Sequence, residues 1–266
     1  MILLAMVLAL LLDSFVPHAD KLKISAWHWL EHNALAIATR GFPSAPLVIT
    51  VVVILSVPLL LLISKLLLPD QALVTLAFET AALWFALGPR SLYQELQSGS
   101  GQLNCSSVLR WRNQAEKSPD TQLISESFYR LFLPIMWYLV GGSIVATTVR
   151  ALVVFCDQHD TLRETDEHSL IKLINWLIIV PAWLMVMTFG LMGRLSETWH
   201  TWQTQQQADQ EHVVHRLHQL ELSLGASANA AVDKSGDLVA LGNLVQRSLI
   251  AWLALTAVFT LGGVIA

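Results

Sequence analysis

The sequence predicts an all-α, polytopic membrane protein: a helix bundle with five or six spans, an interfacial amphipathic helix and two helical cytoplasmic loops. Residues 131–149 form a run of nineteen residues without a charge, bounded by Arg130 and Arg150. A helix of that length nearly crosses the roughly 30 Å hydrocarbon core of a bilayer. The composition is 54% hydrophobic and only 14% charged, with a mean hydropathy of +0.54, whereas soluble domains carry about 25% charged residues. Ten tryptophans suit a protein that anchors at two membrane interfaces.

Five further apolar runs complete the predicted bundle. Residues 1–16 form a marginal or re-entrant segment, because the first charge is Asp13 and the uncharged part is short for a bilayer. This run has neither a basic start nor a clear small-residue cleavage site, so we favour a membrane helix over a signal peptide. Residues 72–88 are also short and contain Glu79, which predicts a tilted span or a helix packed inside the bundle. The predicted spans are residues 1–16, 47–68, 72–88, 128–150, 172–193 and 248–266, within a single integral membrane domain.

The basic residues predict the orientation of the spans. One face of the predicted topology, which includes the loops 89–127 and 194–247, carries twelve Lys and Arg residues, and the other face carries four. The positive-inside rule therefore places both long loops in the cytoplasm. Residues 21–40 have apolar side chains at helical spacing, which predicts an amphipathic helix lying on the cytoplasmic face. Cys105 and Cys156 fall in loops on opposite faces, so we expect no disulfide between them.

Both cytoplasmic loops are predicted to contain helices. Ser118 followed by Pro119 is typical of a helix N-cap and a first helical position. Residues 196–224 are polar and rich in glutamine, which predicts one long helix projecting from the membrane. The residues expected to break this helix are Gly225, Ser227, Asn229 and Gly236.

The sequence contains no pattern that assigns a catalytic or metal-binding group. His212, His215 and His218 recur at a spacing of three, but no carboxylate or cysteine completes a metal pattern. We therefore favour a solvated or partner-facing surface for these histidines. Residues 99–101 are Gly-Ser-Gly without the Lys-Ser/Thr of a Walker loop. The net charge of −4 gives no reason to expect nucleic acid as a partner.

Five polar residues are the candidates for a ligand site. Acidic and basic groups at a membrane surface can together hold Mg²⁺ and phosphate, although helix capping and an interfacial salt bridge explain the same residues. An acid within an apolar span is costly and is a functional candidate by default; here the alternatives are a pairing with an interior arginine or a position away from bilayer depth. The candidates are Glu79, Asp120, Thr121, Glu126 and Arg130.

Four segments carry a resemblance to a known family. They are LWFALGPR at residues 83–90, ESFYRLF at 126–132, PIMWYLVGG at 134–142 and NWLIIVPAWL at 175–184. Their sequences, order and spacing resemble the AmpE/CobD family of integral membrane proteins. Residues 10–13, Leu-Leu-Leu-Asp, are similar to the start of that family, whereas Trp183 stands where the family usually has arginine.

The resemblance implies one of two activities. The CobD/CbiB branch is adenosylcobinamide-phosphate synthase, which uses ATP and Mg²⁺ to form an amide in cobalamin assembly. Where that branch has Ser-Arg-Asp-Thr, this chain has Ser118-Pro119-Asp120-Thr121. It has Glu126, but Ser127 stands where asparagine belongs, no Asp-Gly follows, and residues 151–154 stand where the branch has Asn-Thr-Leu-Asp. The AmpE branch lacks the same polar residues and is named for the regulation of β-lactamase induction, which is linked to cell-wall recycling.

We therefore expect an AmpE-like regulatory or sensory protein of the bacterial inner membrane, with a muropeptide or nucleotide as a possible ligand. A retained synthase activity, with ATP and Mg²⁺, is the enzymatic alternative that the resemblance allows, and the lost motifs argue against it. A scaffold subunit that binds a soluble cytoplasmic partner through residues 199–224 is another alternative. Transport is disfavoured, because one intramembrane charge and no inverted repeat of broken helices are evident.

Overall fold

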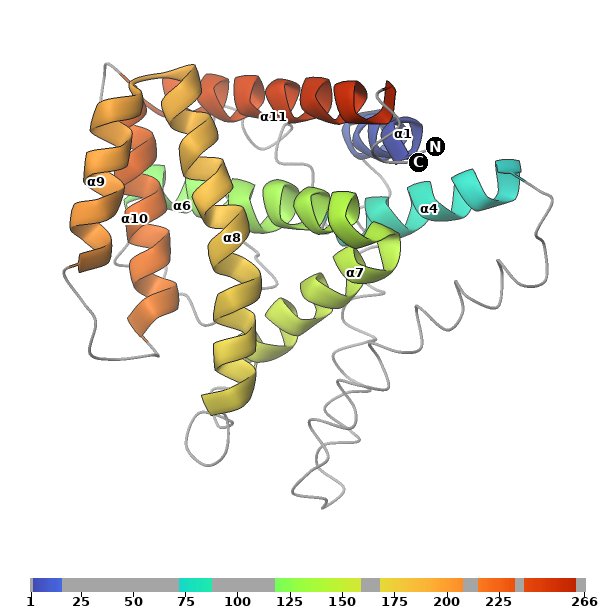
Figure 1. The fold of residues 1–266 in the computed structure, drawn as a ribbon, viewed down its shortest axis with the longest axis horizontal. Helices are drawn as coiled ribbons and strands as arrows, with labels where there is room; N and C mark the ends of the chain where they lie inside the picture. Colours follow the sequence, from blue (N-terminus) through green and yellow to red (C-terminus); the bar gives the residue numbers. More distant parts are fainter. Residues whose placement is uncertain are drawn as a thin grey trace. The chain divides into compact units, whose positions relative to one another are not determined.

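The computed structural model describes residues 2–15, 72–87, 118–158, 168–207, 215–232 and 237–261. Every regular element in these ranges is a helix, which confirms the predicted all-α class for this part of the chain (Figure 1). The predicted span 47–68, the predicted interfacial helix 21–40 and the part of the first cytoplasmic loop that contains Cys105 lie outside the described residues.

Three described helical stretches are long and apolar enough to cross a membrane. Two shorter apolar helices, Ile2–Leu12 and Thr75–Ala86, fall below that length. The described residues are thus compatible with a lipid bilayer, and the total of five or six spans stays a prediction. The three long stretches are Pro119–Val153, Asn175–Met192 and Leu238–Val258.

The chain forms two compact units, and the first contains α1 (Ile2–Phe15), α4 (Ala72–Ala86) and almost all of α7 (Leu133–Gln158). Helix α1 packs against α4. Ala5, Met6 and Ala9 of α1 are fully buried and lie on one face of that helix.

Helix α7 is broken at Gly142, where the backbone has φ 72° and ψ −169°. This region is open almost only to glycine, because a Cβ clashes with the backbone there. The nineteen-residue run 131–149 is therefore not the continuous helix that the sequence predicted. Arg150, predicted as the end of the span, is buried inside a helix that continues to Gln158.

The second unit contains α6 (Pro119–Ser127), the π-helix η2 (Phe128–Phe132), α8 (His168–Met192), α9 (Leu195–Gln207), α10 (His215–Ala231) and most of α11 (Leu238–Leu261). Helix α10 packs against α6, α8 and α9. Aromatic rings join η2, α8 and α11, since Phe132 contacts both Phe189 and Trp252 edge to face. The Trp252 Nε1–H donates a hydrogen bond of 2.9 Å to Thr188 Oγ1.

One face of α8 is apolar and exposed, as expected of a helix that contacts lipid. Trp176, Ile179, Val180 and Trp183 recur at positions i, i+3, i+4 and i+7, so they form one stripe along the helix. A contiguous apolar stripe of this kind is unusual on a soluble monomer.

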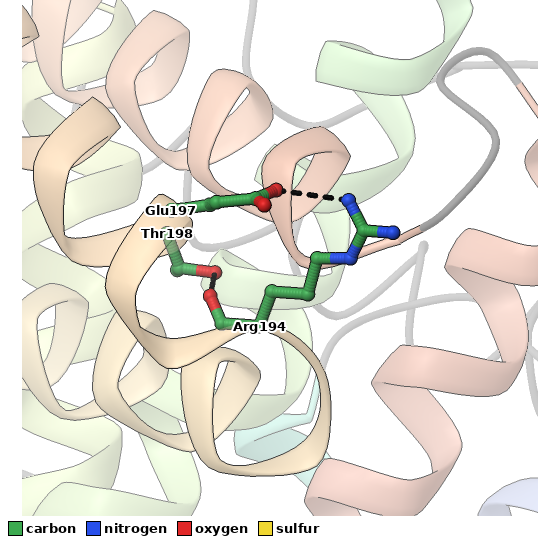
Figure 2. A network of polar contacts seen from close by, with 3 residues as sticks. All are labelled: Arg194, Glu197 and Thr198. Atoms are coloured by element: carbon green, nitrogen blue, oxygen red, sulfur yellow. Dashed lines mark hydrogen bonds and ion pairs between the residues drawn. The ribbon is translucent and has the colours of Figure 1, made fainter.

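The predicted single helix over 196–224 is wrong, because α9 and α10 are separate helices that pack against each other (Figure 1). The turn between α8 and α9 is short, and polar contacts hold the start of α9. Figure 2 shows Arg194 paired with Glu197, with 3.1 Å between Nη1 and Oε2, and Thr198 Oγ1 donating to the Arg194 carbonyl at 2.7 Å. Gly193 of the same turn leaves no room for a Cβ, which would collide with the Ala231 carbonyl oxygen.

Two predicted boundaries also differ. Helix α10 continues through Gly225, Ser227 and Asn229 to Ala231, although these residues were expected to break it. Helix α11 begins at Leu238, capped by Asp237, so the predicted span 248–266 starts ten residues late. The prediction had taken Arg247 as a loop residue, whereas it lies inside the helix with an exposed side chain.

Candidate functional site

The candidate site begins at the first turn of α6. Ser118 is the N-cap, and its Oγ accepts a hydrogen bond of 3.4 Å from the Thr121 N–H, as the sequence predicted. Pro119 occupies the first helical position, where its missing N–H costs nothing. Asp120 follows in the first turn, where the helix dipole favours an acid. Its Oδ2 also accepts a long hydrogen bond of 3.5 Å from Asn229 Nδ2 of α10.

A glycine brings α6 and α10 into close contact. A Cβ at Gly225 would lie 2.6 Å from Thr121 Oγ1 and 3.0 Å from its Cα. Glycine therefore serves here to let a threonine of α6 approach the α10 backbone, and not to end the helix. This approach and the Asp120–Asn229 hydrogen bond define the α6–α10 contact.

The π turn η2 directly follows α6, and the sequence explains its position. Pro134 cannot donate a hydrogen bond to the Arg130 carbonyl, and in a regular α-helix its ring clashes with that carbonyl. The wider turn avoids this conflict, with the Leu133 N–H donating to the Phe128 carbonyl five residues earlier. π turns are rare and often mark functional positions.

A buried ion pair joins α6 to this π turn. Arg130 Nε lies 2.7 Å from Glu126 Oε2, and the two residues are only 3% and 2% exposed. The sequence had allowed an interfacial salt bridge between them, and the pair is instead buried. Both residues have further interactions as well. Charged groups removed from water in this way are retained only when they are paired and hydrogen-bonded.

The structure brings four of the five predicted residues together on one helical stretch. Asp120 and Thr121 contact α10, and Glu126 and Arg130 pair with each other. The fifth, Glu79, belongs to the first unit, where it accepts a hydrogen bond from the Tyr138 hydroxyl. Tyr138 is thus one partner of Glu79, and the pairing with an interior arginine that the sequence analysis considered stays a prediction.

Sequence reasoning missed two polar residues of the second unit. Glu221 of α10 was taken as an ordinary residue of a solvated helix, yet it is only 2% exposed. Ser125 of α6 is fully buried, and its Oγ has no hydrogen-bond partner in the described structure. The small residues that follow Glu221 on α10 could have signalled a closely packed helix.

The Mg²⁺ that the family resemblance implies does not fit these residues as they stand. Asp120 and Glu126 are six positions apart on one helix, which separates them by about 9 Å along the axis and places them on different faces. The Glu126 carboxylate is also occupied by Arg130. Among the described residues there is no group of three or more His, Cys, Asp or Glu side chains that could hold a metal ion.

No protein-family model, curated protein or solved structure matches this chain.

Proposed function

We propose that this chain is an AmpE-like regulatory or sensory protein of the bacterial inner membrane, and that it responds to an anionic ligand taken up by Arg130. The observation that carries this proposal is the buried Glu126–Arg130 pair at the π turn. A buried ion pair contributes little net stability compared with apolar side chains of similar volume. Its presence beside a long apolar helix is therefore better explained by a function than by folding.

The proposed switch is an exchange of anions at Arg130. In the ligand-free state, Glu126 supplies the carboxylate that the guanidinium needs. A ligand with a carboxylate or phosphate can replace Glu126, because arginine binds both groups in the same forked geometry. Muropeptides and nucleotides, the two ligand classes that the family resemblance suggests, both carry such groups.

A change at Glu126 can affect the rest of the second unit through the contact between α6 and α10. Glu126 lies five positions after Thr121, which contacts Gly225 of α10, and the Asp120–Asn229 bond of the same interface is long and weak. Releasing Glu126 separates its buried carboxylate from the Arg130 charge, so α6 must shift or the carboxylate must take up water. A shift of α6 would change its contact with α10, and α10 also packs against α8 and α9.

The proposal is tested by thermal unfolding of the detergent-purified chain with muropeptides, ATP–Mg²⁺ or cobinamide precursors. A ligand that binds the native state raises the melting temperature with concentration. We expect a rise with muropeptides that disappears in Arg130→Met. In Glu126→Gln the same rise should occur at lower ligand concentration, because the internal competitor is weakened.

The matched control is Glu197→Gln, which removes an exposed acid that also pairs with an arginine. This variant should respond as the wild type does. A rise only with ATP–Mg²⁺ and cobinamide would support the synthase alternative instead. A chain that responds to no ligand would contradict the anion-exchange proposal and favour a scaffold that binds a soluble partner.

A further inference from the structure

One face of α11 is exposed along the helix, and its chemistry changes at Arg247. The residues of this face recur at helical spacing, and all of them belong to the second unit. Its first part is polar and its second part is apolar, with Ile250 57% and Val258 65% exposed. The residues that define the face are Asn243, Gln246, Arg247, Ile250 and Val258.

The opposite face of α11 forms the packing contacts of the helix. Ser248, Trp252 and Thr256 are buried there, and the Trp252 Nε1–H donates its hydrogen bond to Thr188 Oγ1 of α8. Helix α11 is nevertheless the least buried of the three long apolar stretches. Its exposed face is therefore in contact with the surroundings of the second unit, and these surroundings must suit both an arginine and a row of apolar side chains.

An anion with an apolar tail meets both requirements. The guanidinium of Arg247 presents a fork of N–H donors that matches the oxygens of a phosphate group. Asn243 and Gln246 lie on the same face within one turn of Arg247, and their side-chain amides can donate further hydrogen bonds. Among the described residues no carboxylate forms an ion pair with Arg247, so the anion that balances its charge comes from outside this part of the chain.

The length of the apolar part fits the acyl chain of a phospholipid. From Arg247 to Val258 the helix rises by about 16 Å. One leaflet contributes half of the roughly 30 Å hydrocarbon core, which is nearly the same length. The predicted topology also places Arg247 on the cytoplasmic side, and anionic lipids give the cytoplasmic leaflet a negative surface that attracts basic residues.

We infer that the exposed face of α11 binds an anionic phospholipid. The Arg247 guanidinium holds the lipid phosphate, the amides of Asn243 and Gln246 donate to headgroup oxygens, and an acyl chain lies along Ile250 and Val258. This site uses neither Glu126 nor Arg130, so it and the proposed exchange of anions at the π turn can fail separately.

The test is native mass spectrometry of the detergent-purified full chain, titrated with phosphatidylglycerol or with phosphatidylcholine of the same acyl chains. The first phosphatidylglycerol should bind about fivefold more tightly than the first phosphatidylcholine, because the choline ammonium opposes the attraction to arginine. Arg247→Gln should remove this preference, and Arg247→Lys should keep most of it. Ile250→Ser should weaken the binding of both lipids alike, since this residue contacts the acyl chain and not the headgroup.

The matched control is Arg194→Gln, which removes another exposed arginine of the same unit, one that is already paired with Glu197. This variant should keep the preference for phosphatidylglycerol. An equal loss in Arg194→Gln and Arg247→Gln would reveal a general effect of charge and overturn the site, as would an unchanged preference in Arg247→Gln.

A second control separates a lipid from a free phosphate ester. Glycerophosphoglycerol, the same headgroup without acyl chains, should not displace phosphatidylglycerol at equal concentration, and full displacement would contradict the lipid as occupant. Because Arg247 is exposed, its variants should fold, which circular dichroism in the same detergent checks. The wild type alone is also decisive, since equal affinities for the two lipids would refute the inference.

Discussion

Removing both members of the Glu126–Arg130 pair should harm the protein far less than removing either one. The expectation follows from the burial of the pair. At 2.7 Å and an effective dielectric constant of about 20, the attraction between the charges is about 6 kcal/mol. The desolvation of each ion costs several kcal/mol, which offsets most of that attraction.

The three variants differ in what they leave buried. Glu126→Leu removes the carboxylate that pairs with the buried Arg130, and Arg130→Met removes the cation that pairs with the buried Glu126, so each should lower the free energy of unfolding by about 3–5 kcal/mol. The double variant replaces both charges by apolar groups of similar size. We expect it to lie within about 2 kcal/mol of the wild type, with the remaining loss reflecting imperfect packing of the new side chains.

The assay is unfolding of the detergent-purified chain in a denaturing detergent, followed by the fluorescence of its ten tryptophans. The informative quantity is the coupling energy, the difference between the loss in the double variant and the sum of the two single losses. We expect a coupling of at least about 4 kcal/mol. Additive losses would refute the reasoning, because they would mean that the two charges are stabilised independently. Glu197→Gln, in the half-exposed pair, should change stability by less than about 0.5 kcal/mol.

Three further predictions concern packing, and the same unfolding assay checks each of them. Thr188→Val should cost about 1–3 kcal/mol by leaving the buried Trp252 N–H without an acceptor, and adding it to Trp252→Phe should cost much less. Gly225→Ala should cost about 1–3 kcal/mol through the clash with Thr121, and a second change, Thr121→Ala, should restore part of the loss; no recovery would contradict the contact. Gly142→Ala meets no atom within 4 Å, so a loss of about 1–3 kcal/mol would report backbone strain alone, and unchanged stability would argue against the break.

Local signals predicted much of the second unit correctly. Ser118 and Pro119 mark the start of α6, because capping depends only on neighbouring backbone groups. The spacing of four between Glu126 and Arg130 places them together on any helix. Their burial was not predictable, since it depends on helices that pack around them from distant parts of the chain.

The main errors concern glycine, whose role depends on tertiary contacts. Gly225 was interpreted as a helix breaker, yet it lies inside α10 because the approach of Thr121 requires a residue without a Cβ. Gly142 was interpreted as part of a continuous span, yet it is the one described residue with positive φ. Glycine permits both conformations, and the sequence of an apolar run does not distinguish between them.

The departures from α-helical geometry fall beside buried polar groups. The run from Pro119 to Gln158 departs from the α-helix twice, at the π turn with Arg130 and at Gly142 next to Ser143. In an apolar environment each irregularity is costly, because no water replaces the lost backbone hydrogen bonds. The described residues of α8 and α11 contain no π turn and no positive φ. Pro134 accounts for the position of the π turn, and the buried Glu126–Arg130 pair beside this turn is where we propose the exchange of anions.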